Sequence, residues 1–143
     1  MPEGSHGMSL RREAAERLIV ALDMPSIDEA ITLVNELSGV VFAFKVGFHL
    51  LVDPNYNNLV QAIFENNAKI FLDLKMYDID STIESAVRNA AARNISFITV
   101  HYNRRVVEAA VRGRGNSSLK ILSLGSYPNV DLLLLSSYSQ SNR

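Results

Sequence analysis

Apolar residues along this chain follow two alternating patterns. Short continuous apolar runs end at a charged residue, and longer segments with apolar residues three and four positions apart follow them. Short continuous runs are typical of buried parallel strands, and the longer spacing is typical of helices with one buried face. The predicted strands are residues 18–22, 40–44, 69–72, 97–100 and 119–124. The predicted helices run from Ser26 towards Gly39, through residues 59–64, and over residues 81–93 and 104–112.

The first predicted helix carries the clearest boundary signals. Ser26 is placed as its N-cap, and Glu29 follows three residues later as in a capping box. Gly39 is a stop signal, because glycine commonly ends helices. Residues 53–55, Asp-Pro-Asn, form a polar loop before the next helix.

Strands that alternate with helices predict an α/β fold in which helices cover a parallel sheet. Periodicity alone does not decide between two arrangements of the sheet. An open doubly wound sheet could be complete in 143 residues. A (β/α)₈ barrel of the TIM type needs at least roughly 200 residues, so this chain would hold its first four βα units and a fifth strand.

The chain divides into three parts by composition. Residues 1–8 have no apolar stretch like that of a signal peptide and are interpreted as a tag-like or disordered leader. Residues 9–125 are expected to form the partial barrel domain. The alternating pattern decays afterwards, so residues 126–143 are interpreted as a divergent C-terminal tail.

Composition narrows the classes of function. The chain is 48% hydrophobic and 20% charged, as in ordinary globular proteins. A net charge of −1 gives no electrostatic argument for binding nucleic acid or a membrane surface, and no apolar run reaches the ~20 residues of a membrane helix. There is no cysteine, which excludes disulfides and thiolate catalysis and fits a cytoplasmic protein. The three histidines lack the spacing of metal ligands.

Charged side chains collect at the ends of the predicted strands. In parallel α/β folds, that edge of the sheet gathers ligands and catalytic groups. Taken singly, each residue also fits a solvated ion pair or a packed strand end. The residues that follow the first four predicted strands are Asp23, Lys45, Asp73 and His101, and Lys75 and Asp78 lie just beyond the third. If the first three strands are neighbours, we expect Asp23, Lys45, Asp73 and Lys75 to converge.

Alternating carboxylates and ammonium groups suit a decarboxylation. A lysine between aspartates is favoured in its protonated form, so it is a ready proton donor. A substrate carboxylate beside Asp73 would be repelled, and loss of CO₂ would relieve that repulsion. Lys75 could then protonate the carbon left behind.

Four segments together resemble the orotidine 5′-phosphate decarboxylase family. They are residues 21–23 (Ala-Leu-Asp), 44–47 (Phe-Lys-Val-Gly), 71–79 (Phe-Leu-Asp-Leu-Lys-Met-Tyr-Asp-Ile) and 99–101 (Thr-Val-His). Their order and spacing match as well, and residues 78–82 resemble the bacterial branch. The similarity runs from about residue 18 to residue 122.

The resemblance implies a (β/α)₈ barrel that acts as a homodimer with a shared active site and without metal or organic cofactor. It implies conversion of orotidine 5′-phosphate to UMP and CO₂. Lys75 resembles the proton donor, and Asp73 resembles the carboxylate that faces the leaving group. Asp78 resembles an acid that reaches into the neighbouring subunit's site. Lys45 resembles the lysine that links the ribose hydroxyl to an aspartate, and Asp23 resembles the ribose-binding carboxylate.

The remaining site residues are implied by the same resemblance. Ile79 and Thr82 match residues that the partner donates near the ribose, and His101 matches a strand-end histidine. Ser126 is the expected counterpart of a serine that contacts the pyrimidine. The chain has no Gly-Ile-Arg segment like the one in the family's phosphate site.

Two alternatives stay open. A sister enzyme on the same barrel, such as hexulose-phosphate synthase or keto-gulonate-phosphate decarboxylase, shares the D-x-K-x-x-D pattern and uses Mg²⁺. Residues 78–82 and 45–47 favour the decarboxylase of orotidine 5′-phosphate. The chain could instead be an inactive barrel fragment. An open half-barrel exposes strand edges and apolar faces, so we expect it to associate with itself.

Overall fold

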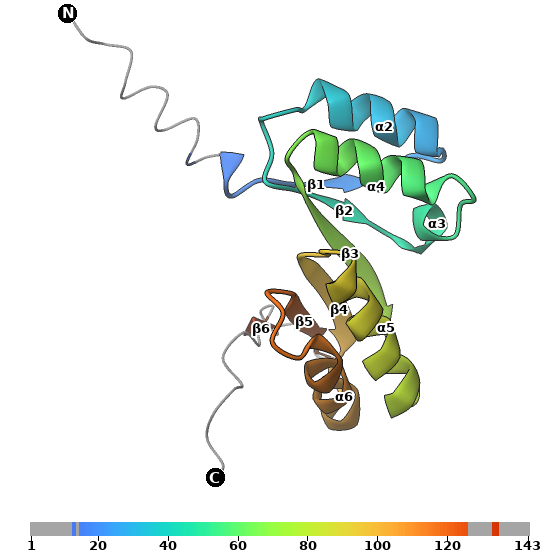
Figure 1. Cartoon of the computed structure of the whole chain (residues 1–143), viewed down its shortest axis with the longest axis vertical. Helices are drawn as coiled ribbons and strands as arrows, with labels where there is room; N and C mark the ends of the chain where they lie inside the picture. Colours follow the sequence, from blue (N-terminus) through green and yellow to red (C-terminus); the bar gives the residue numbers. More distant parts are fainter. Residues whose placement is uncertain (1–12, 14, 126–132, 135–143) are drawn as a thin grey trace, which may run out of the picture. The chain divides into compact units, whose positions relative to one another are not determined.

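The computed structural model describes residues 13, 15–125 and 133–134. The chain divides into two compact units, Met1–Phe71 and Leu72–Arg143. Strand β3, Lys69–Met76, begins in the first unit and continues in the second. Figure 1 shows the elements of each unit in sequence colours.

The first unit consists of parallel strands and the helices that connect them. Its elements are β1 (Ile19–Leu22), α2 (Ile27–Glu36), β2 (Ala43–Val46), α3 (Phe48–Leu51), α4 (Tyr56–Glu65) and the start of β3. β1 and β2 pair in parallel, with Leu22 opposite Val46. Helices α2 and α4 lie side by side (Figure 1) and bury apolar residues such as Val34 and Ile63.

Local signals place the start of α2 and the loop before α4 as expected. Ser26 is the N-cap of α2, and its hydroxyl accepts a hydrogen bond from the Glu29 amide at 3.2 Å. In the loop before α4, the Asp53 carboxylate accepts a hydrogen bond from the Asn55 amide at 2.8 Å, which closes an Asx turn. These predictions are confirmed.

The second unit repeats the pattern of strand and helix. Its elements are the rest of β3, α5 (Asp80–Ala92), β4 (Phe97–His101), α6 (Arg104–Arg114), β5 (Lys120–Leu124) and β6 (Leu133–Leu134). β4 and β5 are parallel, with Val100 opposite Ser123, whereas β6 pairs with β5 in the antiparallel sense. Alternate residues of β4, Ile98 and Val100, are fully buried, as are Val87 of α5 and Ala109 of α6.

The α/β class with parallel strands is therefore confirmed, but several boundaries were wrong. β2 lies about three residues later than predicted, and β3 continues through Asp73 and Lys75 to Met76. α6 includes Gly113 and Arg114, beyond the predicted end at residue 112. The short helix α3 and strand β6 were not predicted. β1 was expected to be buried, yet Ile19 is 40% exposed, because β1 pairs with β2 alone among the described strands.

Helices α5 and α6 approach each other closely at Gly113. A Cβ atom built on Gly113 would lie well inside van der Waals distance of the Glu84 carbonyl oxygen in α5. Gly113 is buried, so the two backbones meet where a side chain would otherwise stand. The glycine is thus required by packing and not by an unusual backbone angle.

We predict that Gly113→Ala destabilises the protein by roughly 1–2 kcal/mol, because the clash with α5 outweighs the better helix propensity of alanine. Urea unfolding followed by circular dichroism measures the change. Gly115→Ala is a control, since nothing lies within 4 Å of its Cβ position and its cost would come from a φ of +55°. Amide shifts around Glu84 should move only in Gly113→Ala. A more stable Gly113→Ala variant would contradict the packing argument.

Candidate active site

Asp73 and Lys75 form an ion pair on β3. The Lys75 Nζ lies 2.9 Å from Asp73 Oδ2. The two residues are separated by Leu74, which is buried, so their side chains leave the strand on the opposite face. The Asp73 side chain is 13% exposed and that of Lys75 is 53% exposed. The two side chains project to the same side and lie close together, as expected, with the carboxylate mostly buried and the ammonium group open to solvent.

Thr99 of β4 joins this pair through two further hydrogen bonds. Its Oγ1 accepts from the Lys75 amide at 2.8 Å and donates to Asp73 Oδ1 at 2.9 Å. Thr99 is 2% exposed. In the sequence, Thr99 appears only as part of the Thr-Val-His motif, and no role was predicted for it. The available signal was a hydroxyl between Ile98 and Val100 in a strand that is otherwise apolar up to His101.

The backbone of Lys75 has an unusual conformation for a residue in a strand. Its φ is +47°, in the left-handed region. The other non-glycine residues with positive φ in the described part of the chain are Asn67 and Asn94, which follow α4 and α5, where asparagine is common. A lysine in this region costs about 1–3 kcal/mol and is held only by its surroundings. Such strain collects at functional sites.

The loop between β3 and α5 carries the next group of expected site residues. The Asp78 carboxylate accepts a hydrogen bond from the Ile79 amide at 2.7 Å. Ile79 is the N-cap of α5 and is 68% exposed, and the Thr82 amide donates to its carbonyl oxygen at 3.0 Å. An open pocket of about 380 Å³ lies beside this loop. Its lining residues are Tyr77, Asp78, Ile79, Asp80, Asn103, Arg105 and Val106.

His101 is the last residue of β4 and contacts the same loop. Its ring centroid lies 5.8 Å from that of Tyr77, and the two planes meet at 70° in an edge-to-face arrangement. Both side chains are exposed. The structure therefore brings His101 to the loop that carries Asp78, within the second unit.

Asp23 and Lys45 belong to the first unit. Lys45 lies opposite Ala21 in the register of β1 and β2, and Asp23 follows the last residue of β1. The two residues thus lie at the same end of two parallel strands, as expected. Their convergence with Asp73 and Lys75 stays a prediction. Ser126 lies outside the described residues.

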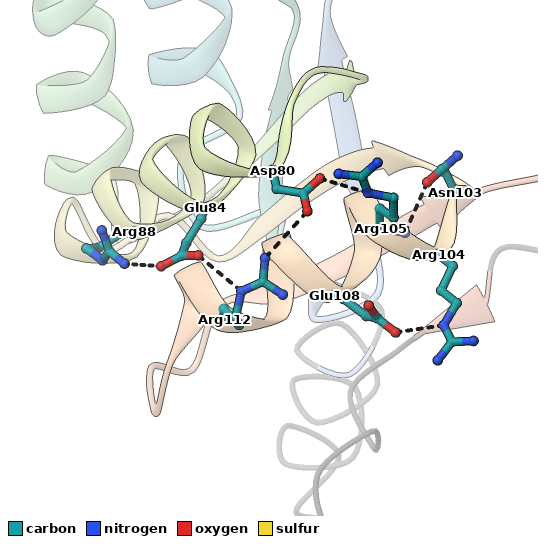
Figure 2. A network of polar contacts seen from close by, with 8 residues as sticks. All are labelled: Asp80, Glu84, Arg88, Asn103, Arg104, Arg105, Glu108 and Arg112. Atoms are coloured by element: carbon teal, nitrogen blue, oxygen red, sulfur yellow. Dashed lines mark hydrogen bonds and ion pairs between the residues drawn. The ribbon is translucent and has the colours of Figure 1, made fainter.

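A network of charged side chains connects α5 to α6 (Figure 2). Arg105 lies 3.6 Å from Asp80, and Arg112 donates to Glu84 at 3.1 Å. Arg88 donates to the other oxygen of Glu84 from the next turn of α5. The hydrogen bond from Arg112 is the main reason that the pKa of Glu84 lies below its ordinary value, and Arg88 adds to the shift. The Glu84–Arg88 contact joins residues four apart on one helix, which the sequence pattern can indicate. No sequence signal pointed to the contacts from Arg105 and Arg112, because they depend on how the two helices pack.

Sequence comparison finds one family whose profile matches the chain. The sequence profile of the orotidine 5′-phosphate decarboxylase / HUMPS family matches residues 16–142. Orotidine 5′-phosphate decarboxylase from Nitrobacter winogradskyi is 41% identical over 128 residues, which are 90% of this chain and 52% of that protein. The protein of the same name from Methylococcus capsulatus is 39% identical, over 82% of this chain and 48% of that protein. The chain spans about half the length of the curated relatives it matches.

Solved structures agree with this placement. The crystal structure of orotidine 5′-phosphate decarboxylase from Lactobacillus acidophilus matches with a TM-score of 0.60 and 30% identity, over 74% of this chain and 51% of that one. A crystal structure of an uncharacterized conserved protein from Geobacillus kaustophilus matches with a TM-score of 0.64 and 29% identity, over 79% of this chain and 56% of that one. The fold class expected from the sequence, the first part of a (β/α)₈ barrel, is confirmed.

In the part of the chain that the structure describes, no helix has the length and apolar character to cross a membrane.

We predict that the stabilising contribution of Glu84 depends on pH. Because its pKa is lower in the native state than in the unfolded chain, the contribution is complete at neutral pH. It declines as the pH falls through the lowered pKa, where both states become protonated. Glu84→Gln should therefore lower the midpoint of thermal unfolding at pH 7, and the gap to the unaltered chain should close in acid.

Glu108→Gln is the matched control for Glu84→Gln. Glu108 accepts from Arg104 on its own helix at 2.8 Å and is 50% exposed, so its loss should matter little. The difference in the midpoint of thermal unfolding between Glu84→Gln and the unaltered chain should shrink in acid. A difference that stays constant from neutral pH into acid would rule out ionisation of Glu84 as the origin of its stabilising contribution.

Proposed function

Because the chain belongs to the orotidine 5′-phosphate decarboxylase / HUMPS family, we propose that it carries the acid–lysine part of an active site that converts orotidine 5′-phosphate to UMP and CO₂. The observation that carries this proposal is the Asp73–Lys75 pair on β3, with its ammonium group open to solvent. The family profile covers both decarboxylases and sugar-phosphate enzymes, but the curated relatives reported above bear the name of the decarboxylase.

The proposed reaction assigns opposite tasks to the two side chains. The substrate carboxylate lies next to Asp73, where like charges repel each other. Breaking the bond between the ring carbon and the carboxylate releases CO₂ and leaves the electron pair on that carbon. The Lys75 ammonium group then gives a proton to the same carbon, and the positive charge stabilises the developing carbanion. The lysine regains its proton from solvent, which reaches its exposed Nζ.

The other site residues keep the roles that the family resemblance implies. Asp23 and Lys45 bind the ribose, and His101 lies beside the substrate. Asp78 completes the charge network of a neighbouring subunit. Ile79 and Thr82 reach the same neighbouring site, and Ser126 contacts the pyrimidine. No metal or organic cofactor takes part in this proposal, and a cytoplasmic location suits a nucleotide substrate.

We predict that UMP formation by the 143-residue chain is slow and depends on Lys75. Lys75→Ala removes the proton donor, so turnover should fall by at least about 10²-fold. Lys69→Ala is the matched control, because Lys69 lies on the same strand but packs over the Phe42 ring, 4.6 Å from its centroid. The assay follows UMP from orotidine 5′-phosphate with and without EDTA.

Three outcomes of this assay would contradict the proposal. Turnover that requires Mg²⁺ would favour the sister enzymes of the same barrel. Turnover that survives Lys75→Ala would remove Lys75 from the chemistry. Complete absence of UMP formation would show that this chain alone is not an active enzyme, as the fragment hypothesis expects.

The proposal also includes a homodimer with a shared site. In the second unit, the homodimer is supported by large apolar side chains that are exposed around the loop before α5. Tyr77 is 69% exposed and Ile79 is 68% exposed, and both line the pocket of about 380 Å³. Exposed apolar groups of this size are typical of surfaces that another molecule covers.

We predict that Ile79→Asp weakens self-association by at least about tenfold, because it would place a charge in the interface. Sedimentation equilibrium over a range of protein concentrations measures the dissociation constant. Val52→Asp is the matched control: Val52 is 75% exposed and lies in the first unit, after α3. A monodisperse monomer, or equal effects of the two substitutions, would count against an interface at this loop.

A further inference from the structure

Asp73, Lys75 and Thr99 form a closed ring of polar contacts. The Lys75 amide donates to Thr99 Oγ1 at 2.8 Å, and this hydroxyl donates to Asp73 Oδ1 at 2.9 Å. The ring closes through the other carboxylate oxygen, which lies 2.9 Å from Lys75 Nζ. The backbone of the lysine and its own ammonium group are thus both tied to the same carboxylate.

The direction of each hydrogen bond in the ring is fixed. A backbone amide can only donate, and an ionised carboxylate can only accept. The hydroxyl between them must therefore accept from Lys75 and donate to Asp73. A threonine or a serine can do both at once, whereas a valine of the same shape can do neither.

Burial makes this hydroxyl hard to replace. Thr99 is 2% exposed, between the buried residues Ile98 and Val100 of β4. Water has little access to take over its two bonds. Without the hydroxyl, the Lys75 amide and one oxygen of Asp73 would each lose one hydrogen bond in a partly buried place.

The unusual backbone conformation of Lys75 indicates what the ring of polar contacts does. With a φ of +47°, Lys75 is held where an L-residue is rarely found. Its amide hydrogen bond to Thr99 is anchored on a neighbouring strand, which opposes relaxation of the backbone to an extended form. The same hydroxyl orients the carboxylate so that Oδ2 faces the ammonium group.

We propose that Thr99 is a positioning residue, whose hydroxyl holds the Lys75 backbone in its left-handed conformation and sets the geometry of the Asp73–Lys75 pair. The structural part of this inference stands on the contacts of the second unit. Its consequence for turnover rests on the proposed function, in which Lys75 donates a proton.

Amide hydrogen exchange of the full chain, followed residue by residue by NMR, tests the proposal without any need for turnover. In Thr99→Val, the Lys75 amide should exchange about tenfold faster, while amides of Ile98 and Ile121 stay unchanged. Thr99→Ser keeps the hydroxyl and should return the Lys75 amide to within about twofold of its original rate.

Ser123→Ala is the matched control for the loss of a buried hydroxyl. Ser123 is 3% exposed on β5, and its Oγ has no hydrogen-bond partner among the described residues. Its removal should leave the Lys75 amide unaffected. If Thr99→Val fails to fold, the unaltered chain still decides the question: exchange of the Lys75 amide at the rate of an unprotected amide would overturn the proposal.

Kinetics separates positioning from simple stability. Where Lys75-dependent UMP formation is measured, Thr99→Val should lower kcat by about tenfold or more, with little change in KM, and Thr99→Ser should restore it. An unchanged exchange rate in folded Thr99→Val, or equal effects of the valine and serine variants, would refute the role of the hydroxyl. Failure of the decarboxylase assay alone would refute the proposed function and leave the exchange result standing.

Discussion

The close approach of α5 and α6 is the constraint on which the second unit depends. Gly113 lets the two backbones meet at Glu84, and no larger residue fits without moving a helix. The short distance then allows charged side chains to bridge the helices, as Arg112 does to Glu84 at 3.1 Å. Because α5 begins directly after the loop with Asp78, this packing also fixes where that loop ends. The packing requirement at Gly113 thus helps to position the loop of the candidate site, although the two lie far apart in the sequence.

The acid–lysine part of the site is built on strands and not on loops. Asp73 and Lys75 lie within β3, and Thr99 reaches them from β4. Strand residues are held by ladder hydrogen bonds and by buried neighbours, so their side chains keep their positions better than those of a loop would. A charge network that must be in place before the reaction begins benefits from this rigidity. The left-handed φ of Lys75 is the cost of placing its side chain there.

The sequence predicted the alternation of strands and helices and the proximity of Asp73 and Lys75, because both depend on local patterns. The N-cap at Ser26 and the helix over residues 80–92 follow from residues next to one another in the chain. The ring through Thr99 could not be predicted, since it depends on the register of β3 against β4. The bridge between Arg112 and Glu84 depends likewise on how α5 and α6 are placed, and hydrophobic periodicity does not define that placement.

The errors at the C-terminal ends of β2 and β3 and the position of the site have one common cause. A strand was predicted to end at its first charged residue, on the assumption that both faces stay apolar to the end. In the structure, three strands instead carry a polar residue between two buried apolar neighbours. These polar residues are Lys45, Asp73 and Thr99. Alternation inside an apolar strand shows that one face has become polar while the other still packs against helices. A polar residue between two buried apolar neighbours therefore marks where the candidate site begins, and the strand itself continues beyond it.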